Sequence, residues 1–285
     1  MQKSKLDQFF SIPAAAVLMA VVCNVLWGSA FPFIKLGYRL FAIDSADTAS
    51  ILCFAGVRFM MGAALVWLAG LALNRRPLPM PHGKTLASAC GLGLWQTAAQ
   101  YFFYYSAVAL LTGAMGGILN STQSFMGVIL AHFLYGKADR MTPRKALGCA
   151  LGFGGVLIAT LGNHGSGSAK GMAFMLIASA IFASAGPWNK AVTQYADSFS
   201  VCVLNLGVGG LVLAVMGFAM GGGLHPESAA GIPVLLFLAF ISGAGYVIWA
   251  LLNGEPLFEW NYLAALLLVC IGIYLVNRAP QEAKA

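Results

Sequence analysis

The chain has 285 residues, of which 60% are hydrophobic and only 9% are charged, and its formal net charge is +7. Soluble domains carry about 25% charged residues, so this composition excludes an ordinary soluble protein. A transmembrane β-barrel needs repeated segments of about ten alternating residues, and the sequence has no such alternation. We therefore expect an all-α polytopic membrane protein that contacts the lipid bilayer and has no nucleic-acid partner.

Nine hydrophobic segments follow one another along the chain, separated by short loops that are polar or contain Gly and Pro. A helix that crosses a membrane needs about 20 mostly apolar residues, and each segment is close to that length. We predict nine transmembrane helices, at residues 12–34, 48–73, 85–109, 112–136, 145–162, 171–189, 198–220, 231–252 and 260–277.

Basic residues gather in alternate loops, mainly at the amino end and in loops 74–84 and 137–145. Cytoplasmic loops retain Lys and Arg, so this alternation predicts a multi-pass protein of the inner (cytoplasmic) membrane with a cytoplasmic amino terminus. Nine spans would place Arg278 and Lys284 on the opposite side, which conflicts with the same rule.

The stretch from Thr85 to Gly136 contains no Lys, Arg, Asp or Glu, and it is long enough for two spans with a turn near Leu111–Gly113. Gln96, Gln100 and Tyr104 recur at every fourth position, on one face of the first of these spans. The second has a small and polar face formed by Gly113, Gly117, Asn120, Ser124 and Gly127. A polar atom that faces lipid without a partner costs several kcal/mol, so we predict that both faces line a cavity at mid-membrane depth.

Two parts of the chain resemble each other. Residues Ala30–Lys35 resemble Ala185–Lys190, with Pro and Lys at equal spacing in both. Later, Leu134–Gly136 resembles Leu252–Gly254, but at a shorter spacing. The second copy is therefore shorter by about one span and its loops.

We predict two repeats from this pattern, residues 1–164 with five helices and residues 165–285 with four. The absent helix belongs near residues 253–254. Because five is an odd number, the second repeat enters the membrane inverted, which is typical of many transporters.

Four motifs, taken in order, resemble the EamA family of the drug/metabolite transporter (DMT) superfamily: Trp27–Lys35, Arg58–Phe59, Leu134–Gly136 and Gly254–Leu257. The resemblance covers nearly the whole chain. It implies ten helices in two inverted five-helix repeats, both termini in the cytoplasm, and a central cavity lined by helices one, three, four, six, eight and nine. It also implies export or exchange of amino acids, nucleotide-type metabolites or drugs.

The chain departs from this 5+5 pattern where the counterpart of the ninth helix is missing, between Asn253 and Gly254. A natural deletion, an engineered chain and a reversed last helix remain alternatives. Two functions follow. The first is a membrane transporter, acting as an exporter or an exchanger, that moves small polar or amphipathic metabolites by alternating access. The second is a degenerate or truncated, non-transporting membrane protein that folds alone or with a partner.

Amides and phenols orient a polar ligand, while indole and phenol rings hold its apolar or cationic parts. On this chemistry we predict a substrate cavity formed by Asn24, Trp27, Gln96, Gln100, Tyr104, Asn120, Gln123, Trp188, Tyr246 and Trp249. For Trp188 and Trp249, anchoring at the membrane interface is the alternative. Arg58 is the one charge well inside a span, which favours substrate binding; a structural cation bonded to backbone carbonyls is the alternative.

Every Asp and Glu lies in a loop, at a helix end or in a tail. Intramembrane carboxylates form the usual proton relays, so their absence from the spans favours a facilitator or exchanger. The sequence contains no HExxH, GxSxG or P-loop motif, and its six cysteines show no metal-binding spacing. We expect no enzymatic activity, no cofactor and no metal site, and a small molecule as the substrate.

Overall fold

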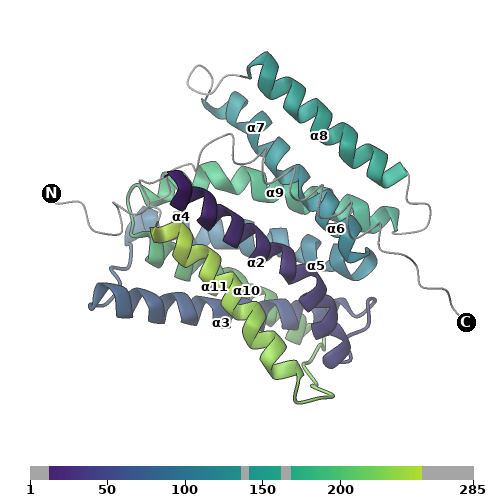
Figure 1. Cartoon of the computed structure of the whole chain (residues 1–285). Coiled ribbons are helices and arrows are strands. Elements are labelled where there is room, and N and C mark those ends of the chain that lie inside the picture. The colour runs from purple at the N-terminus through teal and green to yellow at the C-terminus, as the bar shows by residue number, and fades with distance from the viewer. Residues whose placement is uncertain (1–12, 136–140, 162–167, 252–285) are drawn as a thin grey trace, which may run out of the picture. The chain divides into compact units, whose positions relative to one another are not determined.

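The computed structural model describes residues 13–135, 141–161 and 168–251, and every regular element among them is a helix (Figure 1). The elements are α2 (Pro13–Leu40), α3 (Thr48–Asn74), α4 (Gly83–Leu92), the π-helix η1 (Gly93–Ala99), α5 (Gln100–Leu110), α6 (Gly113–Asn120), α7 (Thr122–Tyr135), α8 (Pro143–Leu161), α9 (Ala169–Thr193), α10 (Ser198–Ala219) and α11 (Gly231–Leu251). Residues Leu26–Gly254 form one compact unit, and all contacts given below lie within it. Of the other unit, which comprises Met1–Val25 and Glu255–Ala285, only the first turns of α2 are described.

The helices confirm the predicted all-α class. Because α4, η1 and α5 are continuous and only Ser121 separates α6 from α7, the described residues form eight helical segments that correspond to the first eight predicted spans. Among the described helices, three are long and apolar enough to cross a membrane, namely Thr48–Leu73, Ala169–Thr193 and Ser198–Ala219. The predicted ninth span at 260–277 and the predicted deletion at 253–254 lie outside the described residues.

Side chains placed just before the helices explain where several of them begin. Asp47 accepts a hydrogen bond from the backbone N–H of Ser50 at 3.0 Å, and Asp197 accepts one from Ser200 at 3.1 Å. Thr112 caps α6 in the same way, after the extended residue Leu111. The first N–H groups of a helix have no partner within it, and such caps supply one. The predicted turn near residues 111–113 is therefore confirmed.

The helices differ from the predicted spans in two places. The helix α2 continues to Leu40, beyond the expected end at residue 34, because Ile34, Tyr38 and Phe41 remain buried against neighbouring helices. The third segment contains a π-helical stretch, which sequence periodicity did not indicate. Its looser i→i+5 turn rotates the side chains before it relative to those after it.

The helices α3 and α10 make a close contact through small residues. A Cβ placed on Gly56 would lie 2.3 Å from the backbone nitrogen of Ala214, and one on Gly217 would lie 2.6 Å from the backbone of Ala49. Such distances are possible only for glycine, and small residues let helix backbones approach in membranes. The helix α11 also packs along α3, while α5, α6 and α7 pack along α9.

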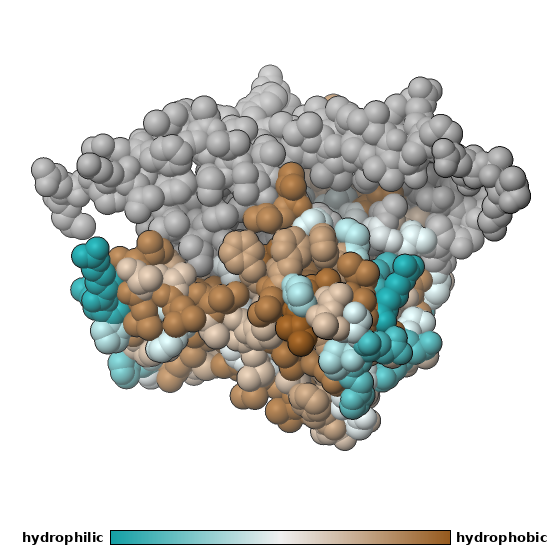
Figure 2. Space-filling model, turned by 60° about the horizontal axis from the view of Figure 1, so that its bottom comes forward, coloured by the Kyte–Doolittle hydropathy of each residue, from teal (hydrophilic) through white to brown (hydrophobic). Residues whose placement is uncertain are grey.

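The described surface matches a protein that lies in a bilayer. Figure 2 shows hydrophobic residues gathered across the middle of one face, with hydrophilic residues at its two edges. Large apolar side chains such as Leu211, Val215 and Phe240 are at least half exposed. In water such a surface would be unfavourable, whereas lipid chains cover it without cost.

Candidate functional site

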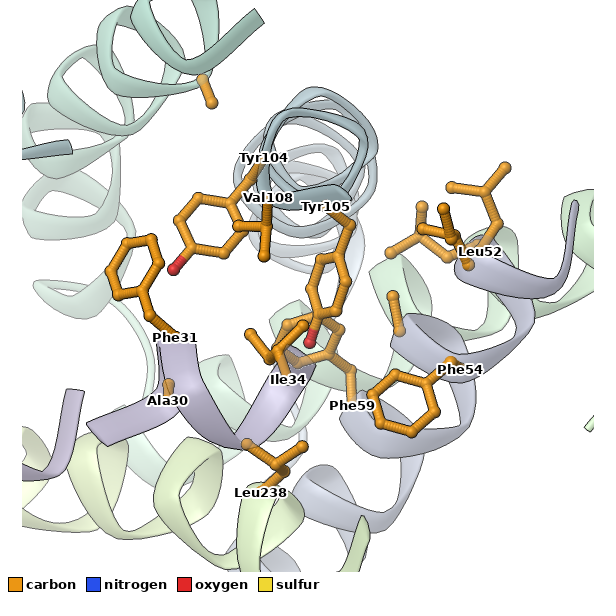
Figure 3. Packing of buried hydrophobic residues seen from close by; sticks show 14 of the residues in the cluster. Ala30, Phe31, Ile34, Leu52, Phe54, Phe59, Tyr104, Tyr105, Val108 and Leu238 are labelled. Atoms are coloured by element: carbon orange, nitrogen blue, oxygen red, sulfur yellow. The ribbon is translucent and has the colours of Figure 1, made fainter. Parts of the chain in front are cut away.

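Four helices converge around the ring of Phe31 on α2. This ring lies 5.5 Å from the ring of Tyr104 on α5, and the two side chains point toward one another in Figure 3. A Cβ placed on Gly116 of α6 would lie 3.1 Å from the Phe31 ring and 3.7 Å from Cε of Met175 on α9. We call these four residues the aromatic layer.

The directions of the helices fix what lies next to the aromatic layer. The ring of Phe103 lies 5.5 Å from that of Phe174, while the Trp95 indole N–H donates to Ser184 at 2.9 Å. Residue numbers therefore rise along α9 as they fall along the helix formed by η1 and α5, so the two run antiparallel. The turn at Leu111 also makes α6 antiparallel to α5. The helix α6 is consequently parallel to α9.

Positions four apart on a helix stack on one face, so a single turn from the aromatic layer can be followed on each helix. Four residues later on α6 and α9, and four residues earlier on the antiparallel α5, polar residues lie at the same level. They are Gln100 on α5, Asn120 on α6 and Ser179 on α9. We call these three the polar layer.

The polar layer contains unpaired polar atoms. Gln100 is 3% exposed and Ser179 is fully buried, yet Gln100 Oε1 and Ser179 Oγ have no hydrogen-bond partner within the described part of the chain. An unsatisfied buried polar group costs about 1–3 kcal/mol. Asn120 is half-buried, and its side chain makes no hydrogen bond to any described residue. Water or a polar ligand at this level would supply the absent partners.

Comparison with known proteins identifies the family of the chain. The family model described as "EamA-like transporter family" matches residues 14–161, which is more than half of the chain. This chain belongs to the EamA-like transporter family. The protein is thus a multi-pass membrane transporter by family, in a group whose members are transporters and not enzymes.

The fold of this EamA-like transporter also occurs among solved structures. One of them, whose title reads only "Crystal structure of protein", has a TM-score of 0.66 and 17% sequence identity, over 94% of this chain and 91% of that chain. At this identity the likeness shows the fold alone. No curated protein sequence matches the chain.

The structure divides the predicted face of Gln96, Gln100 and Tyr104. Gln96 lies in η1 and turns to α10, where its Oε1 accepts a hydrogen bond from Asn205 Nδ2 at 2.8 Å. Thr97 donates to Asn205 Oδ1 at 2.6 Å, and all three side chains of this cluster are buried. Gln96 therefore joins two helices of this EamA-like transporter, while Tyr104 lies against Phe31 of α2.

Arg58 is 4% exposed and connects three helices. Its Nε donates to the backbone oxygen of Leu238 at 3.1 Å and to Ser242 Oγ at 3.0 Å, both on α11, and its Nη1 donates to the Tyr105 hydroxyl on α5. Its guanidinium carbon also lies 5.1 Å from the centre of the Phe59 ring, as in a cation–π contact. These neutral partners match the structural alternative, in which the cation is bonded to backbone carbonyl groups.

Trp188 lies on a different side of α9 from the polar layer. It is 37% exposed, and its indole N–H donates to Ser88 Oγ on α4 at 2.9 Å. Trp95, 42% exposed, makes the equivalent bond from η1 to Ser184 on α9. Both indoles therefore lie along the outer seam between these helices. This placement fits the interfacial role that was the alternative for Trp188.

The remaining predicted residues are less closely defined. Gln123 is half-buried near the start of α7, three residues beyond Asn120. Asn24 and Trp27 belong to α2, and Tyr246 and Trp249 belong to α11, but their side chains lie outside the described part of the structure.

Sequence reasoning missed two polar residues, Ser179 and Asn205. Ser179 lies in a run of Ala and Ile, where a small hydroxyl is indistinguishable from a packing residue. Asn205 is an isolated amide in the very apolar helix α10, which is the kind of signal that indicates an interhelical hydrogen bond. Ser179 became recognisable only once α9 was placed beside the third span.

Proposed function

We propose that this protein transports small polar or amphipathic metabolites, such as amino acids or drugs, and binds them at the polar layer. The observation that carries the proposal is the pair of unpaired buried atoms, Gln100 Oε1 and Ser179 Oγ. A resting structure tolerates this cost when a substrate supplies the hydrogen bonds. Aromatic faces one turn away, at Phe31 and Tyr104, suit the apolar or cationic part of the same molecule.

The proposed mode is export or exchange through an inner membrane, with the amino terminus in the cytoplasm. Among the described residues, Asp44, Asp47, Asp197 and Glu227 are the acids, and each lies outside the helices. No carboxylate from the described residues is therefore available as a proton relay inside a span. This distribution supports exchange or facilitated movement driven by substrate gradients.

A matched pair of serine and proline positions supports alternating access between two inverted repeats, residues 1–164 and 165–285. Pro32 lies inside α2 and Pro187 inside α9, and each follows a serine by three residues. Ser29 Oγ donates to the oxygen of Leu26, and Ser184 Oγ to that of Ile181, both at 2.7 Å. Proline removes a helical hydrogen bond and serine bonded in this way favours bending. The helices α2 and α9, which the repeat prediction makes counterparts, thus have their backbone hydrogen bonding weakened at corresponding positions.

Transport in proteoliposomes tests the proposal. Vesicles are loaded with a mixture of the common amino acids, and the loss of each over time is measured by mass spectrometry. Gln100→Leu and Ser179→Ala each remove a binding group, so we expect efflux to fall by about tenfold, the effect of one lost hydrogen bond of ordinary strength. Folded yield should stay unchanged, because neither side chain bonds to another helix within the described part of the chain.

Ser106→Ala is the matched control, since Ser106 lies on the same helix and its hydroxyl donates to the backbone oxygen of Phe102. It should leave efflux at the wild-type rate. Equal efflux from the Gln100→Leu and wild-type proteins would remove the polar layer from the mechanism. A wild-type protein that moves none of the loaded compounds, and no drug cation in a parallel assay, would favour the non-transporting alternative.

A further inference from the structure

A groove opens between the start of α4 and the end of α9, on the outer seam of the molecule. It has a volume of about 240 Å³ and is lined by Lys84, Thr85, Ser88, Ala191, Val192 and Tyr195. Its position at the ends of two membrane helices places it at the boundary between lipid chains and water. It lies apart from the polar layer, which faces α2 and α6.

Every polar side chain that lines the groove can donate a hydrogen bond. Lys84 supplies an ammonium group, and Thr85, Ser88 and Tyr195 supply hydroxyls; the six lining residues include no carboxylate. The oxygen of Ser88 accepts from Trp188, and the Ser88 hydroxyl proton is still available for another acceptor. Asp197, the nearest acid along the chain, is occupied at the start of α10 by Ser200. An anionic group with several acceptor oxygens complements this set.

Next to the groove, the exposed indoles of Trp188 and Trp95 form an apolar track along α9. The exposed indoles of Trp188 and Trp95 follow one another along the seam between α9 and the helix formed by α4 and η1, held by Ser88 and Ser184. Indole rings favour the region where head groups meet lipid chains. A free phosphate would use only the donors, whereas a lipid would use the donors and the track.

We propose that this groove binds the phosphate of an anionic phospholipid, with its acyl chains lying over Trp188 and Trp95. The lipid bridges α4 and α9, which the repeat prediction assigns to different repeats. Its presence therefore stabilises the arrangement in which these two helices are in contact. This inference is independent of the substrate and of the polar layer.

Native mass spectrometry of the full chain tests the proposal. Delipidated protein is titrated with dioleoyl phosphatidylglycerol or with dioleoyl phosphatidylcholine, and bound lipids are counted. Phosphatidylglycerol should bind more tightly, and Lys84→Gln should weaken it about fivefold, the contribution of one Lys near an anionic surface. Arg76→Gln removes the same charge from the exposed loop before α4 and should have little effect.

Ala191→Trp provides a second variant that fills the groove and leaves every charge in place. It should weaken phosphatidylglycerol binding as much as Lys84→Gln, while the melting temperature in detergent stays near that of the wild type. Equal losses for Lys84→Gln and Arg76→Gln would indicate only diffuse charge attraction and overturn the proposal. Displacement of the lipid by millimolar inorganic phosphate would show a phosphate site without a role for the acyl chains, and would also overturn it.

Discussion

Gln96 and Gln100 are the same residue type four positions apart in one continuous helix, but their side-chain oxygens differ in hydrogen bonding. Gln96 belongs to a closed cluster in which Asn205 bonds to both Gln96 and Thr97. Gln100 lies in a layer where its carbonyl oxygen, like the hydroxyl of Ser179, has no partner among the described residues. The comparison separates polar groups that hold helices together from those available to a ligand.

The backbone contacts around the two sites differ in the same sense. At the closed cluster, a Cβ on Gly93 would lie 2.9 Å from the backbone oxygen of Asn205, so η1 and α10 are already at their closest approach. Next to Gly116 of the aromatic layer, a Cβ on Gly117 would meet no atom of the described residues within 4 Å. The close packing of η1 on α10 thus lies on the side of the third span where polar groups already hold the helices together.

Gly209→Ala should disrupt the contact between η1 and α10 and have the largest effect. The added Cβ would lie 2.3 Å from Cβ of Thr97 and 2.5 Å from the oxygen of Gly93. Neither neighbour is the end of a flexible side chain, so the two helices must separate. We expect a loss of about 1–3 kcal/mol or more, measured as a lower melting temperature and lower folded yield in detergent. Gly207→Ala should melt like the wild type, because its Cβ would meet, among the described residues, only Cβ of Ala63 at 3.7 Å.

Asn205→Leu should have the next largest effect, because it leaves Gln96 and Thr97 buried without their partner. The expected cost is about 1–3 kcal/mol of stability, again visible as a lower melting temperature. A triple variant that also carries Gln96→Leu and Thr97→Val removes all the orphaned groups and should recover most of the loss. If the triple variant melts no higher than Asn205→Leu alone, the cluster owes its importance to shape and not to hydrogen bonding.

Ser179→Ala should have a small effect of opposite sign. The substitution removes a buried hydroxyl that has no partner among the described residues, so stability should stay constant or rise by up to about 1 kcal/mol. Thermal melting without substrate measures this, alongside Thr97→Val as the paired control from the closed cluster. A clear loss of stability in Ser179→Ala would show that its hydroxyl has a structural partner, and the contrast between the two clusters would fail.

The helices, the tight turn and the class of the protein were predictable, because long apolar runs between charged loops leave few alternatives for a chain in a membrane. The burial of Gln100 and Tyr104 also followed from the high cost of a polar atom in lipid. The partners of these residues did not follow. Periodicity assumes regular α-helical turns, and the π-helix from Gly93 to Ala99 turned Gln96 toward a helix more than a hundred residues later.

The candidate site was predictable only in part, for a similar reason. Ser179 shares its level with Gln100 because α9 runs antiparallel to α5, and no local feature of its sequence reveals that neighbour. Arg58 was recognisable as an unusual charge, but the choice between ligand and structural cation required its acceptors on α11. Tertiary neighbours, and not residue type, decide these roles.

The acid-dependent part of the Asp47 cap is the smallest expected effect, and it gives a contrast from the water-exposed end of α3. Hydrogen bonds from the side chain and backbone N–H of Ser50 hold the pKa of Asp47 below its ordinary value. The cap therefore stabilises the folded protein fully above the ordinary carboxyl pKa, and this stabilisation is lost as the pH falls through the lowered value. Asp47→Ala should cost about 1 kcal/mol near neutral pH, whereas Asp47→Asn should retain the cap and lose the acid-dependent part. Melting temperatures of the three proteins across the acidic range measure both terms, and a wild-type curve parallel to that of Asp47→Asn would show that the carboxylate charge contributes nothing there.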